Sequence, residues 1–150
     1  DLEGKIYVAN FFFATCKTVC PDMNQHMRRI QEKFKGSDEI RLVSYTVDPE
    51  ADSVPVLAEY ARQLKVGNSM WWFLTGPKDS IYTLARESYL LPAAQRIAEG
   101  DFFHSQDLLL IDKDKRIRGI YDGTEKYEVD TLMDEIKVLM HEYYELEKAK

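Results

Sequence analysis

The cysteines of this chain, Cys16 and Cys20, lie four residues apart, directly after an apolar run that ends at Phe13. Cysteines that only fill a core have no reason to be paired at short spacing, so the pair indicates sulfur chemistry. Residues four apart on a helix have Cα atoms about 6 Å apart, which lies within the range for a disulfide. The pair therefore allows a disulfide, a thiol redox couple or a metal site. The alternative is two cysteines that pack as small apolar side chains.

The start of a helix favours the reactivity of both cysteines. Pro21 and Asp22 predict a helix that opens here, and the positive end of a helix dipole lowers the pKa of a nearby thiol. Lys17 adds positive charge beside the pair. Because the thiolate is both the nucleophile of disulfide exchange and the form that binds metals, this location suits redox chemistry and metal binding alike.

His104 is a third candidate, since it lies just before a predicted strand in the segment EGDFFHSQDLLLID. In the fold that alternating strands and helices predict, the loop before the closing hairpin borders the helix that follows the first strand, so we expect His104 to meet Cys16 and Cys20 in space. Cu(I) prefers thiolates and Cu(II) also accepts imidazole, so this set suits copper. Zinc fits as well, but in structural sites it usually takes a fourth protein ligand.

Other residues with chemical potential are expected to have structural or solvated roles. His26 lies beside the apolar stripe of the first helix and is expected at the surface, and His141 lies on a charged face of the last helix. Met23 shares the spacing of core residues. The acidic residues that follow the second strand are expected to form a solvated loop: Asp48, Glu50 and Asp52.

Strands and helices alternate along the chain. Apolar, β-rich runs predict strands at 6–13, 40–47, 70–76, 108–112 and 116–121. Apolar residues at helical spacing predict helices at 21–36, 54–65, about 81–85 and 129–143. Residues 89–103 show no clean period and are expected to form a long loop. The polar turn DKDK joins the last two strands into a hairpin.

This order predicts an α/β fold. Strands that alternate with helices pair in parallel through right-handed crossovers, and the closing hairpin adds an antiparallel edge. We therefore expect a thioredoxin-like three-layer sandwich, with a mixed central sheet flanked by helices. Ligand sites in open α/β sheets lie beyond the carboxyl ends of the strands, which is where Cys16 and Cys20 follow the first strand.

Composition narrows the class of protein. A length of 150 residues with 45% hydrophobic content fits one globular domain, and we expect a single domain over 1–150 that is trimmed at its N-terminus. The net charge of −6, with no basic stripe, argues against a nucleic-acid partner. No apolar run reaches the length of a membrane span, and no signal peptide is visible.

The chain resembles the Sco/SenC copper-delivery proteins. GKIYVANFFFATCKTVCPDM is similar to the family's strand and its C-x-x-x-C-P motif, and SYTVDPEADSVPVLAEYA is similar to its Ser-x-x-x-Asp-Pro segment and the following helix. FLTG and HSQDLLLIDKDKRIRGIYDGT are similar to the family's later strand and its His-bearing hairpin region. The resemblance covers nearly the whole chain.

This resemblance implies a thioredoxin-like metallochaperone that binds one copper ion through Cys16, Cys20 and His104. It implies a role in maturing the binuclear copper centre (CuA) of cytochrome c oxidase. The implied partners are the copper subunit of that oxidase and other copper chaperones or thiol reductants. Family members are usually tethered to a membrane, so it also implies a location on the periplasmic side of the inner membrane or in the mitochondrial intermembrane space.

A thiol–disulfide oxidoreductase is the alternative, with Cys16 and Cys20 as its redox pair. The resemblance implies this role as well, because some members of the family act as thiol–disulfide reductases, and the residues between the cysteines, 17–19, do not distinguish the two functions. Peroxide reduction through a sulfenic acid is a third hypothesis, based on fold similarity alone. His104 is the discriminating residue, because a dithiol reductase does not need it and a three-ligand copper site does.

Overall fold

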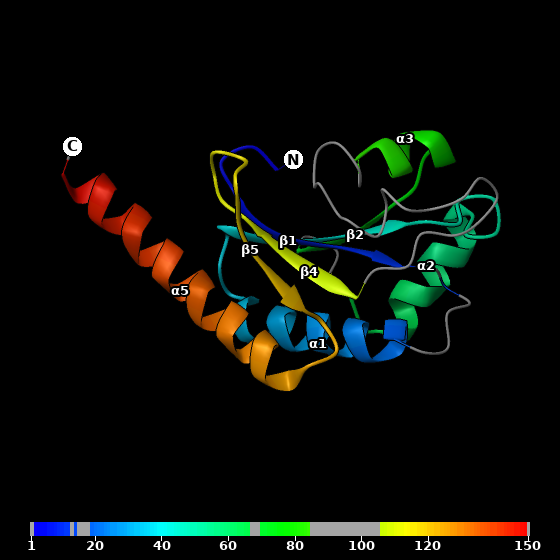
Figure 1. The fold of residues 1–150 in the computed structure, drawn as a ribbon, viewed down its shortest axis with the longest axis horizontal. Coiled ribbons are helices and arrows are strands. Elements are labelled where there is room, and N and C mark those ends of the chain that lie inside the picture. Colours follow the sequence, from blue (N-terminus) through cyan, green and yellow to red (C-terminus); the bar gives the residue numbers. More distant parts are fainter. Residues whose placement is uncertain (1, 13, 15–18, 67–69, 85–105, 150) are drawn as a thin grey trace.

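The predicted alternation of strands and helices is present in the computed structural model, which describes residues 2–12, 14, 19–66, 70–84 and 106–149 (Figure 1). The strands are β1 (Ile6–Phe12), β2 (Ile40–Thr46), β3 (Trp71–Leu74), β4 (Asp107–Ile111) and β5 (Ile117–Asp122). The helices are α1 (Val19–Phe34), α2 (Val54–Gln63), α3 (Lys78–Thr83) and α5 (Lys126–Lys148). The expected loop at 89–103 lies outside the described residues.

The strands form one mixed sheet in the order β3-β2-β1-β4-β5. β1 is central: Val8 pairs in parallel with Leu42 of β2 and antiparallel with Leu110 of β4. β3 continues the parallel half beside β2, and β5 closes the antiparallel half beside β4. The predicted parallel crossovers and closing hairpin are therefore confirmed.

Helices cover both faces of the sheet, which is why every residue of β1 is buried. Alternate residues of β1 enter two separate cores, because successive side chains of a strand point to opposite faces. Ile6 and Val8 pack in the core shared with α1, α2 and α5. Tyr7 and Ala9 pack in the smaller core on the face that carries α3.

The apolar stripes predicted for the first and last helices form the larger core. The buried residues of these stripes on α1 and α5 are Met23, Met27, Ile30, Phe34, Val129, Leu132, Met133, Ile136 and Leu139. The C-terminal part of α5 extends past the sheet in Figure 1. Among the described residues, no helix is long and apolar enough to cross a membrane.

The strand ends that flank the predicted site residues in the sequence share one edge of the sheet. β1, β2 and β3 are parallel, so their carboxyl ends share this edge. β4 runs antiparallel to β1, so it begins at the same edge, and α1 starts on this side of the molecule (Figure 1). The topology therefore supplies a loop-bearing edge of the kind at which α/β proteins bind ligands.

Candidate functional site

Cys20 is the second residue of α1, which begins at Val19. The helix thus starts two residues before Pro21, where the sequence predicted its opening, and it includes this cysteine in its first turn. Cys16, His104 and the side chain of Cys20 lie outside what the structure describes. The mutual distances of these three residues therefore stay a prediction.

The flanking segments nevertheless meet at one edge of the sheet. β1 ends at Phe12, four residues before Cys16, and β4 begins at Asp107, three residues after His104. These two strands are antiparallel neighbours, so the end of one and the start of the other lie at the same edge. The described strand ends that lie nearest in sequence to Cys16 and His104 therefore share a single edge of the sheet.

Asp52 is buried at this edge, so the predicted solvated loop is wrong for this residue. Its side chain is only 1% exposed, whereas Asp48 is partly buried and Glu50 is exposed. Oδ2 of Asp52 accepts hydrogen bonds from the backbone N–H of Ala14 at 2.9 Å and from Oγ1 of Thr46 at 2.6 Å. A buried carboxylate needs such donors, because burial without them is costly.

A chain of buried hydrogen bonds ties α1 to the sheet close to Cys20. Nε1 of Trp71 donates to Oγ of Ser44 at 3.0 Å, and that hydroxyl donates to Oδ1 of Asn10 at 2.5 Å. Nδ2 of Asn10 donates to Oδ1 of Asn24 at 3.1 Å, and Nδ2 of Asn24 donates to the hydroxyl of Tyr60 at 2.8 Å. The chain thereby links β3, β2, β1, α1 and α2.

Sequence reasoning did not identify these polar residues, although one signal was present. Asn10 interrupts an otherwise apolar run, and a polar side chain inside a strand buried on both faces must find a partner. Asn24 lies on α1, one helical turn after Cys20, and is fully buried. The polar chain therefore fixes the part of α1 that directly follows the cysteine.

The remaining histidines lie elsewhere. His26 is partly buried rather than at the open surface, and its Nδ1 lies 2.9 Å from Nη1 of Arg29. Burial first, and the charge of Arg29 second, lower the pKa of His26. His141 is exposed, as expected, and lies 3.9 Å from a carboxylate oxygen of Glu145. Within the described ranges, no group of three His, Cys, Asp or Glu residues could hold a metal ion.

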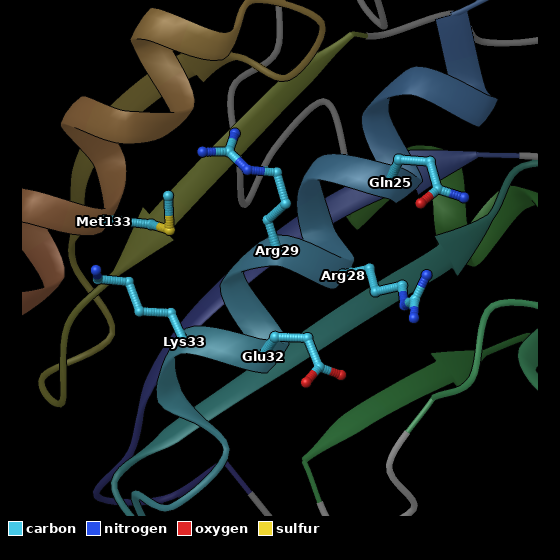
Figure 2. A pocket seen from close by; sticks show the side chains of 6 residues that line it. All are labelled: Gln25, Arg28, Arg29, Glu32, Lys33 and Met133. Atoms are coloured by element: carbon cyan, nitrogen blue, oxygen red, sulfur yellow. The ribbon is translucent and has the colours of Figure 1, made fainter.

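A surface pocket of about 390 Å³ lies on the outer side of α1, against α5 (Figure 2). Its lining includes Arg28, Arg29 and Lys33, with Met133 contributed by α5. Arg29 is already engaged, because it forms an ion pair with Asp130 at 2.5 Å. The pocket offers neither thiolate nor imidazole, so its chemistry is not that of the predicted copper site.

The mixed sheet, with a cysteine in the first turn of the helix that follows its central strand, defines a thioredoxin-like protein. The SCO1/SenC family model matches residues 1–141, and the chain belongs to this family. The SCO1 protein homolog of Bacillus subtilis (strain 168) is 30% identical over 139 residues, which cover 91% of this chain and 72% of that protein. The resemblance noted in the sequence is thus confirmed.

Solved structures agree with this assignment. A SCO1/SenC family lipoprotein from Bacillus anthracis str. Ames superimposes with a TM-score of 0.79 at 26% identity, covering 93% of this chain and 83% of that one. BsSco, described as a member of the Sco family of cytochrome c oxidase assembly proteins with a disulfide switch, gives 0.75 at 28% identity, with coverages of 92% and 81%. Copper-bound ScoI of Arabidopsis thaliana gives 0.70 at 25% identity, with coverages of 95% and 87%.

Proposed function

We propose that this protein is a copper-binding metallochaperone for assembly of the CuA centre of cytochrome c oxidase. Cys16, Cys20 and His104 hold one copper ion in this proposal. The observation that carries it is the SCO1/SenC match over residues 1–141, which spans all three residues. A relative with copper bound and a relative that belongs to the cytochrome c oxidase assembly proteins support it.

The donor set fits copper as cargo. Two thiolates satisfy Cu(I), and an added imidazole makes the set acceptable to Cu(II). The position of Cys20 in the first turn of α1 places it near the positive end of the helix dipole, which favours the thiolate that the metal requires. Loops at the edge of a sheet allow ligands to exchange, and transfer to a partner protein needs such exchange.

The proposed partners follow from the cargo. The copper subunit of cytochrome c oxidase receives the ion, and other copper chaperones or thiol reductants load the site or reduce its cysteines. We place the domain on the periplasmic side of the inner membrane, or in the intermembrane space of mitochondria, tethered to that membrane. The lipoprotein from Bacillus anthracis supports an anchored form.

Copper uptake by the reduced and the oxidised protein tests the proposal. A Cys16–Cys20 disulfide has no thiolate to offer, and metal ligands must be deprotonated to bind. The reduced protein should take up close to one equivalent of copper, and the oxidised protein almost none. Cys16→Ser and Cys20→Ser should each lose tight Cu(I) binding and keep a cooperative unfolding transition. Equal uptake by both redox forms contradicts the proposal.

A thiol–disulfide oxidoreductase is the second candidate, favoured by the disulfide switch of BsSco. One cysteine thiolate would attack a partner's disulfide and displace one partner thiolate. The second cysteine would then attack the mixed disulfide, leaving a Cys16–Cys20 disulfide and a partner reduced by two electrons. The test is reduction of a disulfide-bonded peptide by the reduced protein. His104→Ala should leave this rate unchanged if the activity is independent of copper.

A further inference from the structure

The burial of Asp52 next to the cysteine-bearing segment calls for a functional explanation. Its carboxylate is 1% exposed, yet it lies in the connection between β2 and α2, where a solvated side chain would cost nothing. Oδ2 receives the N–H of Ala14 and the hydroxyl of Thr46, which is itself buried at the end of β2. Bonds of this kind to a carboxylate are about twice as strong as those between neutral groups.

Ala14 occupies the point where the chain leaves the sheet. Two residues earlier, the carbonyl oxygen of Phe12 at the end of β1 accepts a hydrogen bond from the N–H of Val47, the residue after β2, at 2.8 Å. Two residues later in the sequence comes Cys16. The bond from Ala14 to Asp52 therefore extends the attachment of the chain beyond the strand, to within two residues of the cysteine.

We propose that Asp52 is a positioning residue for the Cys16/Cys20 pair. This inference rests on the proposed function, in which the pair alternates between a disulfide and a copper-binding dithiol. Asp52 holds the backbone of Ala14 and so sets where the C-x-x-x-C segment begins. Cys20 is held separately, because α1 is tied to the sheet through Asn24. Fixing both ends lowers the entropy that is lost when the two sulfurs close a disulfide or bind one copper ion.

Asp112 provides a matched comparison within the same chain. It is 2% exposed, and its Oδ1 accepts the backbone N–H groups of Asp114 and Arg116, each at 2.9 Å. It lies after β4, at the edge of the sheet opposite the carboxyl end of β1. Both aspartates are thus buried carboxylates that accept backbone N–H groups, and of the two only Asp52 accepts one from the segment that leads to the cysteines. Asp112 also forms an ion pair with Arg118 at 3.4 Å, which Asp112→Ala removes as well.

The experiment compares Asp52→Ala, Asp52→Asn and Asp112→Ala with the unmodified protein. Each protein is equilibrated with glutathione: the two thiols give two electrons and two protons to one oxidised glutathione, which yields the protein disulfide and two reduced glutathione molecules. Cu(I) affinity of the reduced form is measured by competition with a chromogenic chelator. Urea unfolding of the reduced form, in the absence of copper and glutathione, reports the stability of each protein.

Both alanine variants should unfold at lower urea concentration, because each loses buried hydrogen bonds. Only Asp52→Ala should shift the glutathione equilibrium toward the dithiol and weaken Cu(I) binding, by roughly 10- to 100-fold, the range for groups that support metal ligands. The glutathione equilibrium and the Cu(I) affinity of Asp52→Asn should lie between those of the unmodified protein and of Asp52→Ala, since the amide oxygen can still accept the N–H of Ala14.

An Asp52→Ala protein that is destabilised like Asp112→Ala, with an unchanged glutathione equilibrium and unchanged Cu(I) affinity, overturns the inference. If Asp52→Ala does not fold, the comparison of Asp52→Asn with Asp112→Asn decides. A change in the glutathione equilibrium and Cu(I) affinity that is confined to Asp52→Asn supports the inference. Equal values of both quantities for the two variants overturn it. Failure of the unmodified protein to bind copper or to form the disulfide is a different result, since it refutes the proposed function itself.

Discussion

The side-chain amide of Asn10 on β1 donates a 3.1 Å hydrogen bond to the side-chain oxygen of Asn24 on α1, and neither residue is exposed to solvent. This contact joins the central strand to the helix that carries Cys20. It is part of a buried polar chain, and such chains specify one packing arrangement when all their members are satisfied. The orientation of α1 over the sheet is therefore set by directional bonds as well as by apolar packing.

Replacement of Asn24 by alanine should destabilise the fold. The amide of Asn10 would lose its acceptor in a buried site, and an unsatisfied buried polar group costs about 1–3 kcal/mol. Urea unfolding measures the loss. Gln25→Ala is the matched control, because Gln25 is the next residue of α1 and is exposed. Equal midpoints for the two variants would show that the polar chain does not contribute to stability.

Most of the architecture was predictable because it follows from the spacing of apolar residues. The stripe at Met23, Met27 and Ile30 predicts the buried face of α1, and the continuous run at the start of the chain predicts a strand covered on both faces. The alternation of such segments then leaves few topologies. These residues are buried as predicted, so the helical stripe and the continuous apolar run were enough to identify the two elements.

The polar interior was harder to predict, as Asp52 shows. An acidic residue after a strand is usually solvated, and only the approach of Ala14 and Thr46 in three dimensions makes its burial favourable. Those donors lie 38 and 6 residues away in the sequence. The cysteines and His104 were predicted from residue type, spacing and family resemblance, and their joint geometry remains a prediction.

Gly123 should not tolerate a side chain. A Cβ at this position would lie 2.8 Å from Cγ of Met23, 2.9 Å from Cγ of Leu108 and 3.0 Å from the backbone oxygen of Gln106. Gly123→Ala should therefore destabilise the protein by about 1–3 kcal/mol through overpacking where α1, β4 and the start of α5 meet.

Thermal unfolding checks this prediction, with Gly36→Ala as the control. Gly36 has nothing within 4 Å of the position of a Cβ, so an added methyl group meets open space there. Equal melting temperatures for Gly123→Ala and Gly36→Ala would show that the neighbours of Gly123 move aside with no loss of stability.

His26 should make stability fall as the pH drops below about 6.5. Burial and then the charge of Arg29 lower the pKa of His26 from 6.5, against the opposing charges of Asp22 and Asp130. Below pH 6.5 the unfolded chain therefore binds a proton that the folded chain does not, and this favours unfolding until the pH reaches the folded pKa. Above 6.5 both states are neutral at this residue, and its contribution is fully present.

The variant His26→Gln tests this dependence by urea unfolding at several pH values between about 5 and 8. Its free energy of unfolding should fall less between about pH 7 and 5 than that of the unmodified protein. The comparison uses the change with pH and not the absolute values, since glutamine also alters the contact with Arg29. Parallel profiles for the two proteins would exclude a lowered pKa at His26.

Removal of His104 should affect the two oxidation states of copper unequally. Cu(I) is soft and is satisfied by two thiolates, so His104→Ala should still bind it through Cys16 and Cys20, with lower affinity. Cu(II) binds imidazole nitrogen readily, so its complex should be largely lost from the variant. Because a Cu(II)–thiolate complex is coloured, a Cu(II) titration read by visible absorption follows this loss directly. A Cu(I) competition assay runs beside it.

His141→Ala is the matched control for His104→Ala. It also removes one imidazole, from an exposed position on α5 that lies 3.9 Å from Glu145, and it should keep the Cu(II) spectrum of the unmodified protein. If His104→Ala keeps that spectrum as well, His104 is not a copper ligand. The C-x-x-x-C pair would then be better explained as a redox couple, and the oxidoreductase hypothesis would replace the chaperone hypothesis, because a dithiol reductase needs the two sulfurs and no imidazole.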